Sequence, residues 1–272
     1  MPELPEVETV KETLKLKLLN KKIIDVDIIY PKIIEYPDID TFKNQIKNET
    51  IIDIKRRGKW LMFELNNYYL LSHLRMEGKY NIKTNEPINK HEHVLFKFDD
   101  FNLRYQDTRK FGKMYLYKKD EVFNKHPLNE LGKEPWDETL NVIYLEEKYK
   151  TRKKPVKEVL LDQTIITGIG NIYADEILFL SKLNPYKKVN ELNKTDLENI
   201  IKYTKETLEK AIKEGGTTIR TYTSSEGVHG RFQQHLLVHN KENEKCTICD
   251  SIIIKTRIGG RGTYYCPNCQ KW

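Results

Sequence analysis

Apolar residues recur at helical spacing near the start of the chain. Val7, Val10, Leu14 and Leu18 lie three or four positions apart, so they would share one face of a helix. Pro5 precedes them, and proline is common in the first turn of a helix because its missing N–H needs no partner there. The pattern predicts an N-terminal helix with one buried face.

Short alternating segments follow the predicted helix. Ile24, Val26 and Ile28 alternate with Asp25 and Asp27, as expected for a strand with one buried face. Further strand-like segments cover residues 60–65, 68–74, 94–98 and 113–117. Many short strands separated by polar turns predict an antiparallel sandwich or barrel.

From about residue 121 the pattern becomes helical. Residues 131–135, Leu-Gly-Lys-Glu-Pro, are typical of a linker, and helical periodicity then covers residues 156–163, 171–183 and 195–214. Gly215 and Gly216 supply a stop signal for the last of these helices. We therefore expect an α+β protein whose 272 residues suffice for a β-rich first domain and a helical second domain.

The composition limits the classes of function without selecting one. Charged residues make up 32% of the chain, and 47 basic against 40 acidic residues give a net charge of +7. This excess is compatible with a polyanionic partner, but a lysine-rich solvated surface explains it equally well. No apolar run approaches the length of a membrane span, about 18 residues, and the start does not resemble a signal peptide. We expect a soluble, intracellular protein with no membrane partner.

All four cysteines lie near the C-terminus in two C-x-x-C pairs, Cys246 with Cys249 and Cys266 with Cys269. Sixteen residues separate the pairs, a spacing typical of a zinc ribbon with four thiolates around one ion. Two disulfides or a redox pair are the alternatives, and the lack of a secretion signal disfavours disulfides. Four protein ligands would complete the coordination sphere, so we expect one structural zinc ion and no organic cofactor.

The first residues, Met-Pro-Glu-Leu-Pro-Glu-Val-Glu-Thr, place a proline directly after the initiator methionine. Removal of Met1 would leave Pro2 as a secondary amine, and a free α-amino group has an unperturbed pKa of about 7.7–8.0. Attack by this amine on a sugar's anomeric carbon would give an iminium ion, the electron sink that ring opening and elimination require. Glu3 and Glu6 lie beside it, at the start of the predicted helix, where carboxylates are favoured. The alternative is that Pro2 only permits methionine trimming and begins an exposed tail.

Two glycine-containing turns carry candidate DNA-contacting side chains. Met76 lies in residues 73–78, Arg109 and Phe111 lie in residues 104–112, and each segment ends a strand-like run. An apolar wedge accompanied by arginine is one way in which proteins kink a duplex and extrude a nucleotide. Met76 and Phe111 could equally be core residues, and Lys59, at a strand entry, could be an ordinary surface lysine.

A glycine turn, Thr167-Gly168-Ile169-Gly170-Asn171, opens the helix predicted from residue 171. Backbone N–H groups and the helix dipole at such a turn suit a DNA phosphate. Any tight turn between helices could use the same glycines. A nucleotide-cofactor site is disfavoured because no βαβ unit surrounds the turn.

Taken together, these segments resemble the bacterial formamidopyrimidine-DNA glycosylase family, the bifunctional repair enzymes that remove 8-oxoguanine and ring-opened purines. The resemblance covers essentially the whole chain and rests on the opening nonapeptide, the Gly-Ile-Gly-Asn-Ile-Tyr-Ala-Asp-Glu run and the four-cysteine ribbon. It implies a DNA glycosylase with AP lyase activity that works through β- and δ-elimination. It also implies a monomer of the bacterial cytoplasm, associated with the nucleoid, whose partner is double-stranded DNA with oxidised bases or abasic sites.

The resemblance further implies a domain organisation. A β-sandwich domain with the N-terminal helix would cover residues 1–120, and a linker would cover residues 121–136. A helix–two-turns–helix domain would follow at residues 137–235, with a loop at about 217–230 that closes over the everted base. The zinc ribbon would cover residues 236–272.

Roles for single residues are implied as well. Pro2 would displace the damaged base and form the Schiff base, Glu3 would act as an acid in sugar opening, and Glu6 would support it. Lys59 would take part in base excision and β-elimination, and Arg261 would contact phosphate and assist δ-elimination. Met76, Arg109 and Phe111 would fill the vacated stack. Phosphate contacts would come from His91, Arg152, Lys157, Asn171 and Arg261, and Glu176 would lie near the lesion pocket.

The chain departs from the family's usual pattern at three places. Thr108 stands where proline is common, His239 lies in Val-His-Asn-Lys where Val-Tyr-Gly-Arg is more usual, and Lys245 replaces a proline before the first cysteine. These departures are expected to affect the wedge loop and the approach to the ribbon. No expected catalytic position is lost.

Three other functions stay open at the level of sequence. An enzyme of the endonuclease VIII type would act on oxidised pyrimidines. The sequence Leu-Pro-Glu-Val at residues 4–7 and the pair Arg109 and Phe111 favour the purine-directed branch of the family instead. A noncatalytic damage-binding protein would keep the scaffold without turnover, and the intact catalytic positions argue against it. A zinc-ribbon transcription or RNA-binding factor would explain only the last 27 residues.

Overall fold

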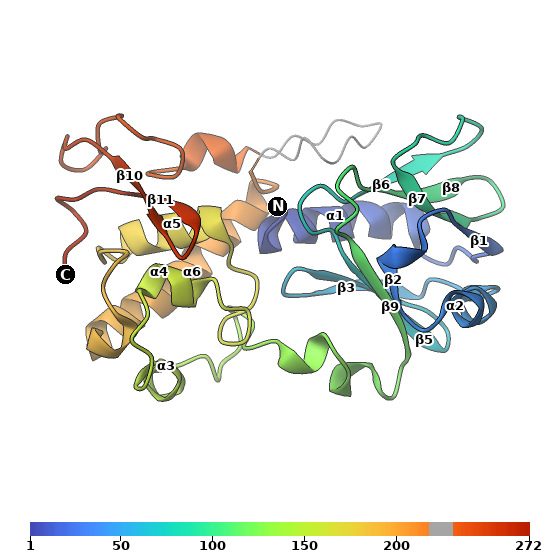
Figure 1. Ribbon diagram of the computed structural model, residues 1–272, viewed down its shortest axis with the longest axis horizontal. Helices are drawn as coiled ribbons and strands as arrows, with labels where there is room; N and C mark the ends of the chain where they lie inside the picture. The colour runs from blue at the N-terminus through green and yellow to red at the C-terminus, as the bar shows by residue number, and fades with distance from the viewer. Residues whose placement is uncertain (218–230) are drawn as a thin grey trace. The chain divides into compact units, whose positions relative to one another are not determined.

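The computed structural model describes residues 1–217 and 231–272. The described residues form two compact units, one of residues 1–129 and one of residues 130–217 with 231–272, and each is described by itself below (Figure 1). The predicted base-closing loop at about 217–230 lies outside the described residues, except for Thr217. Within the described ranges, no helix is both long and apolar enough to cross a membrane.

The N-terminal unit begins with the predicted helix, α1 (Leu4–Leu18). The four apolar residues that predicted it are buried, each with at most 2% of its surface exposed. They pack into a core that also takes side chains from both sheets of this unit. The helix contacts the neighbouring strands β3 (Asp53–Arg57) and β4 (Trp60–Glu64), so its first turn lies on a fixed support.

Two sheets complete the N-terminal unit. The four-stranded sheet has the order β1 (Asp25–Ile28), β7 (Glu92–Lys97), β8 (Asn102–Gln106) and β6 (Lys79–Lys83). The five-stranded sheet has the order β2 (Ile34–Tyr36), β9 (Lys113–Lys118), β5 (Tyr68–His73), β4 and β3. The expected antiparallel pairing is confirmed except at the edge, where the short β2 runs parallel to β9. A short helix, α2 (Ile39–Ile46), is capped by the Asp38 side chain.

The C-terminal unit is helical up to its last residues. Its helices are α3 (Val142–Tyr149), α4 (Val156–Leu160), α5 (Asn171–Leu180) and α6 (Lys194–Lys213). Helices α4 and α5 are shorter than their periodicity predicted. The Asp162 carboxylate accepts the N–H of Thr164 in a turn after α4, and Lys182 adopts a positive φ of 57° after α5.

The end of α6 agrees with the predicted glycine stop. Gly215 and Gly216 have φ angles of 72° and 77°, a left-handed conformation that only glycine adopts easily. The chain ends in the hairpin of β10 (Ile254–Ile258) and β11 (Arg261–Tyr265), which contacts α5. Short 3₁₀ turns cover Pro31–Ile33, Val122–Asn124, Leu128–Glu130, Val189–Glu191 and Phe232–His235.

Candidate functional site

The first turn of α1 holds the candidate nucleophile in a fixed environment. Pro2 is buried, and Glu3 and Glu6 are only 2% and 4% exposed. The two glutamates form a capping box, in which the Glu3 N–H donates to Glu6 Oε2 at 2.9 Å and the Glu3 carboxylate accepts the N–H of Glu6. Pro2 is therefore not part of a loose tail. Its nitrogen is joined to the exposed Met1, so only removal of Met1 frees the amine.

Lys59 lies in a two-residue turn that is tied to α1. Arg57 pairs with Trp60 across the β3–β4 hairpin, which leaves Gly58, with a φ of 56°, and Lys59 as the loop. Arg56 Nε donates to Glu8 Oε2 of α1 at 2.7 Å, and its other end donates to the Gly58 carbonyl at 3.0 Å. Lys59 is 5% exposed, which does not fit an ordinary surface lysine.

His73, which lies beside Lys59, was not among the predicted site residues. Burial, and then the positive charges of Arg75 and Lys59, hold the pKa of His73 well below its usual range. Its Nδ1 accepts the Arg75 N–H at 2.9 Å, so the neutral ring carries its hydrogen on Nε2. A histidine that ends an apolar strand next to a turn was the available signal. The structure thus adds a neutral donor to this corner of the N-terminal unit.

The loop that carries Arg109 and Phe111 is organised by a buried carboxylate. Asp107 accepts the N–H of Arg109 at 3.0 Å and those of Phe111 and Gly112 at 2.8 Å. The Arg109 guanidinium lies 4.8 Å from the centroid of the Phe111 ring, and Phe111 is 48% exposed. Phe111 is therefore not a core residue. An exposed aromatic side chain on a rigid loop, with an arginine stacked on it, suits a wedge between bases.

Tyr105 lies between the two predicted wedge loops. It is completely buried, and a Cβ added to Gly78 or Gly112 would come within 2.3 or 1.7 Å of its hydroxyl oxygen. Both loops therefore require glycine where they pass Tyr105. Met76, on the first loop, is half-buried. The His91 carbonyl accepts the Asp107 N–H at 3.0 Å, which places the expected phosphate ligand His91 beside the same loop.

In the C-terminal unit, the expected phosphate ligands Asn171 and Arg152 each bond to a partner within the unit. Asn171 begins α5 directly after Gly170, and its Nδ2 donates to the Gly262 carbonyl at 2.9 Å. Arg152 pairs with Asp162 at 2.8 Å, while about a third of its side chain, 36%, stays exposed. Burial raises the pKa of Asp162, but hydrogen bonds from Thr164 and Arg152 outweigh it, so the pKa falls below its usual value.

Lys157 and Glu176 lie inside the C-terminal unit. Lys157 is fully buried and its ammonium donates to Asp175 Oδ1 at 2.6 Å, so the expected direct phosphate contact is not supported in this conformation. The Glu176 carboxylate accepts the N–H groups of residues 237, 238 and 239 at 2.7 to 3.0 Å. Burial raises the pKa of Glu176 although these hydrogen bonds lower it. Its position near a lesion pocket stays a prediction.

Arg261 is presented at the tip of the β10–β11 hairpin. Ile258 pairs with Arg261, and the two-residue loop between them is Gly259-Gly260, with φ angles of 54° and 76°. Two positive φ angles are typical of the type I′ turn, which glycine favours. Arg261 is exposed, so its guanidinium is available to a phosphate.

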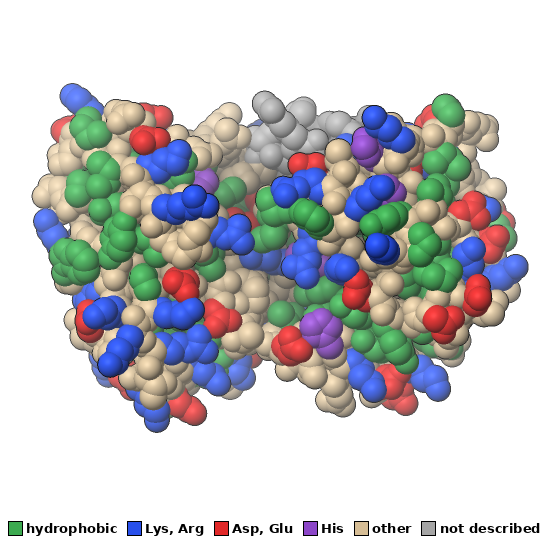
Figure 2. Space-filling view, viewed as in Figure 1, with side chains coloured by type: hydrophobic (Ala, Val, Ile, Leu, Met, Phe, Trp, Pro, Cys, Tyr) green, Lys and Arg blue, Asp and Glu red, His purple; other side chains and the backbone are tan. Residues whose placement is uncertain are grey.

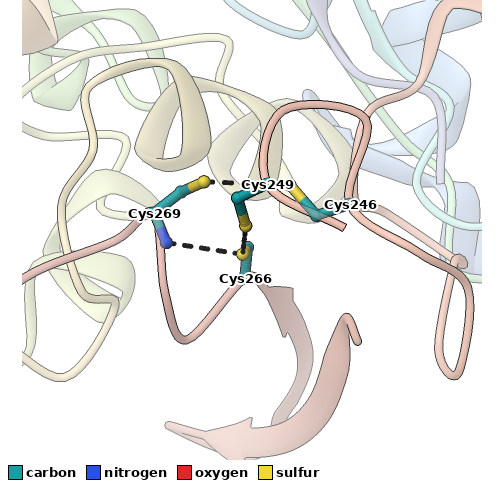
Figure 3. A group of neighbouring side chains, drawn as sticks. All are labelled: Cys246, Cys249, Cys266 and Cys269. Atoms are coloured by element: carbon teal, nitrogen blue, oxygen red, sulfur yellow. Dashed lines mark hydrogen bonds between the residues drawn. The ribbon is translucent and has the colours of Figure 1, made fainter. Parts of the chain in front are cut away.

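The four cysteine sulfurs converge from two turns, as Figure 3 shows. All four lie within 4.8 Å of one another, with Cys246 and Cys269 at 3.8 Å and Cys249 and Cys266 at 3.4 Å. Four sulfurs each about 2.3 Å from one zinc ion lie about 3.8 Å apart, so the arrangement fits zinc. Burial, reinforced by the neighbouring sulfurs, raises the pKa values of Cys266 and Cys269. Hydrogen bonds from Ser251 and Asn268 instead lower the pKa of Cys249 to about 5.

Basic side chains are spread widely on the surface. Figure 2 shows Lys and Arg side chains over both units on the visible face, mixed with acidic ones. Several lysines are neutralised by carboxylates, among them Lys55 and Lys119 by Glu64. Hydrogen bonds from Lys55, opposed by burial and aided by Lys119, lower the pKa of Glu64 to about 2. Net charge alone therefore does not mark a binding surface.

Comparison with known proteins finds matches to one protein family from the N-terminus to the C-terminal cysteines. Sequence models described as the formamidopyrimidine-DNA glycosylase N-terminal domain, the formamidopyrimidine-DNA glycosylase H2TH domain and the zinc finger found in FPG and IleRS match residues 1–114, 131–223 and 243–271. The formamidopyrimidine-DNA glycosylase of Bacillus cereus is 49% identical over 273 residues, which cover 99% of each chain.

Two solved structures from Lactococcus lactis are also similar. A glycine-to-proline mutant of FPG in complex with Fapy-dG-containing DNA superimposes with a TM-score of 0.94, at 41% identity and with 100% of both chains covered. The complex of Fpg with DNA that contains an abasic site gives 0.93 at 40% identity, covering 99% of this chain and 100% of that one.

Proposed function

The chain belongs to the formamidopyrimidine-DNA glycosylase family, and we propose that it excises oxidised purines from double-stranded DNA through the amine of Pro2 and then cleaves the abasic site. The observation that carries this proposal is the buried capping box of Glu3 and Glu6, which fixes the residue behind Met1. The relatives whose names and DNA ligands match these substrates support it.

The first chemical step is attack on the sugar. After removal of Met1, the Pro2 nitrogen attacks the anomeric carbon, the bond from that carbon to the base breaks, and the proton released by the amine neutralises the departing base. Glu3 lies beside the nucleophile and can protonate the sugar ring oxygen as the ring opens. The product is a positively charged Schiff base, which Glu6 supports through its hydrogen bond to the Glu3 N–H.

Elimination follows from the electron sink. The iminium acidifies the neighbouring C–H, and loss of this proton expels the 3′ phosphate in β-elimination. Lys59 is held near α1 by the Glu8–Arg56–Gly58 contacts and is suited to proton transfer in these steps. Arg261 would bind the 5′ phosphate, whose release completes δ-elimination. Hydrolysis of the remaining Schiff base returns free Pro2.

Binding and base eversion use the remaining residues. Met76, Arg109 and Phe111 would fill the stack left by the everted base, and His91, Arg152 and Asn171 would contact phosphates. Cys246, Cys249, Cys266 and Cys269 would hold the zinc ion, which would join the two cysteine pairs and so restrain the turn that follows the Arg261 hairpin. We place the protein in the cytoplasm, bound to the nucleoid, because its substrate is genomic DNA.

Substrate choice is tested by comparing excision of 8-oxoguanine opposite cytosine with excision of thymine glycol, in single-turnover assays on otherwise identical duplexes. Faster removal of 8-oxoguanine supports the purine-directed enzyme. Faster removal of thymine glycol would assign the chain to the endonuclease VIII type of activity. Tight binding of both duplexes with no product from either would favour a noncatalytic damage-binding protein.

A further inference from the structure

The hairpin that carries Arg261 contacts the rest of its own unit at three points, two on helices and one on the segment that leads to the ribbon. Asn171 Nδ2 of α5 donates to the carbonyl of Gly262, the next residue after Arg261, at 2.9 Å. At the hairpin turn, a Cβ added to Gly259 would lie 3.0 Å from Glu158 Cγ of α4. On β11, the Tyr264 ring makes an edge-type contact with the His239 ring, with 5.0 Å between the ring centroids and 67° between the ring planes.

Asp175 lies beneath these contacts and connects two of them. Its Oδ1 accepts from Lys157 Nζ at 2.6 Å, and its Oδ2 is 2.7 Å from His239 Nδ1. Lys157 Nζ also donates to the carbonyl of Asn171 at 2.9 Å. One carboxylate thus joins α4, the start of α5 and the segment that leads to the ribbon.

Burial restricts these three side chains to positions in which their hydrogen bonds are kept. Lys157 is 0% exposed, Asp175 1% and His239 7%. A charge held in the interior is costly unless its partners stay at hydrogen-bonding distance, so a shift of any member is strongly opposed. The next residue, Glu176, adds to the restraint because it accepts the backbone N–H groups of residues 237–239.

His239 is the member of this network that contacts the hairpin. It stands where the family more usually has tyrosine, and its Nδ1 reaches the carboxylate while its ring reaches Tyr264. The departure noted in the sequence therefore supplies the second partner of Asp175. Nothing in the chemistry of the reaction requires His239 or Asp175 to touch the DNA.

We propose that Asp175 and His239 are positioning residues that hold the Arg261 hairpin in the orientation needed for δ-elimination. This inference rests on the proposed function, in which Arg261 binds the 5′ phosphate. Asp175 orients His239, His239 packs against Tyr264, and the hairpin carries Arg261 on the same strand. Loss of the Asp175–His239 bond should therefore reduce δ-elimination and leave β-elimination at Pro2 largely unchanged.

The test is a double-mutant cycle on a duplex with an abasic site, read as the ratio of δ- to β-elimination product in a single turnover. His239→Phe keeps a ring against Tyr264 but cannot bond to Asp175, and we expect the ratio to fall about tenfold. Arg261→Ala should lower it further, and the double variant should match Arg261→Ala alone. His235→Phe, the same change elsewhere in the unit, should leave the ratio unchanged.

A second set of variants separates the hydrogen bond to Asp175 from the ring contact with Tyr264. His239→Asn loses the ring contact with Tyr264, but its side-chain N–H can still donate to Asp175, so its ratio should lie between those of His239→Ala and the wild type. If His239→Phe fails to keep the wild-type zinc content and melting temperature, His239→Asn against His239→Ala carries the test, since only Asn can donate to Asp175. Equal ratios for Asn and Ala would overturn the inference.

The remaining outcomes are distinguishable. An equal fall caused by His239→Phe in the wild-type and Arg261→Ala backgrounds, or no fall at all, would overturn the positioning role while the proposed function stands. An Arg261→Ala variant with an unchanged ratio would also overturn it, because the hairpin would then carry no eliminating group. A wild-type protein that yields neither product would overturn the proposed function itself.

Discussion

The two units hold their reactive groups by different physical means. In the N-terminal unit, Pro2 and Lys59 are placed by α1 and the β3–β4 hairpin, which pack on an extended apolar core. In the C-terminal unit, Arg261 lies on a two-stranded hairpin beside a small apolar cluster that buries Cys246 and Cys266 and has Cys249 and Cys269 packed against it. We expect the position of Arg261 to depend on a zinc ion held by the four cysteines and on the buried hydrogen bonds that join Lys157, Asp175 and His239.

This difference separates the groups that act in base excision and β-elimination from Arg261, the group expected to act in δ-elimination. Apolar packing places the nucleophile without a metal ion, so the N-terminal unit should keep its geometry when zinc is removed. The C-terminal contacts should respond to that removal. Perturbations aimed at one unit therefore test whether the other keeps its part of the function.

The largest effect is expected from Pro2→Gly. The variant keeps α1 but lacks the secondary amine, so product formation from an 8-oxoguanine duplex should fall by at least about 100-fold, as when other nucleophiles are removed. Affinity for the duplex, measured by fluorescence anisotropy, should change little. Pro31→Gly, at an exposed turn of the same unit, serves as the control. Unchanged product formation in Pro2→Gly would break the assignment of the nucleophile.

Removal of zinc should come next in size and should act on the other unit. A structural zinc site contributes about 10–16 kcal/mol to folding in small zinc domains, so chelation or Cys266→Ser should unfold the ribbon. We expect duplex affinity to fall at least about tenfold, which is about 1.4 kcal/mol. Base excision at saturating protein should be affected much less. Equal losses of duplex affinity and of the excision rate at saturating protein would show that the C-terminal unit is also needed for base excision itself.

Asp107→Asn should have an intermediate effect within the N-terminal unit. The amide presents N–H groups to the backbone donors of Arg109, Phe111 and Gly112, so at least one buried donor loses its acceptor, at a cost of about 1–3 kcal/mol. The wedge loop should loosen, so excision of 8-oxoguanine should slow more than cleavage of a preformed abasic site. Equal slowing on both substrates would contradict the wedge role. Thermal unfolding gives the stability change.

The smallest expected effect is on the stability of the protein at acid pH. Burial raises the pKa of Glu8, but hydrogen bonds from Lys11 and Arg56 outweigh it, and the folded-state pKa lies below the ordinary value of 4.5. The stabilisation is therefore present above about pH 4.5 and is lost as the pH falls below it. Glu176 in the other unit has a raised pKa, so its contribution to the free energy of unfolding decreases as the pH rises, opposite to that of Glu8.

Glu8→Gln should accordingly reduce the fall in melting temperature between pH 6 and pH 4 by an amount that corresponds to less than about 1 kcal/mol. Glu198→Gln, at an exposed position on α6, should leave this fall unchanged. If Glu8→Gln has the same acid sensitivity as the wild type, the Glu8–Arg56 link does not support the start of α1.

Sequence patterns predicted the elements whose residues alternate or repeat clearly. Val7 to Leu18 predicted α1, and the strand-like segments predicted β1, β4, β5, β7 and β9. Strand β3 was missed because its residues, Asp-Ile-Lys-Arg-Arg, bury only Ile54. The short helix α2 buries only Phe42 and Ile46, too few positions to establish a helical period.

The residues of the candidate site likewise include some that the sequence could identify and some that it could not. The cysteine spacing and the opening nonapeptide are local in sequence, so they could be recognised directly. The Lys157–Asp175–His239 network could not, because it joins residues that are 18 and 64 positions apart and depends on how α4 and α5 pack. The burial of Lys157 has the same origin. Tyr105 was missed because its role depends on two glycines from different loops.

The most direct test of the central claim is borohydride trapping on an 8-oxoguanine:cytosine duplex, with intact-mass analysis and peptide mapping of the N-terminus. The account predicts a covalent protein–DNA adduct at Pro2, on chains that lack Met1. A completely processed chain that binds the lesion tightly and gives no adduct, or an adduct that maps to Lys59, would contradict it.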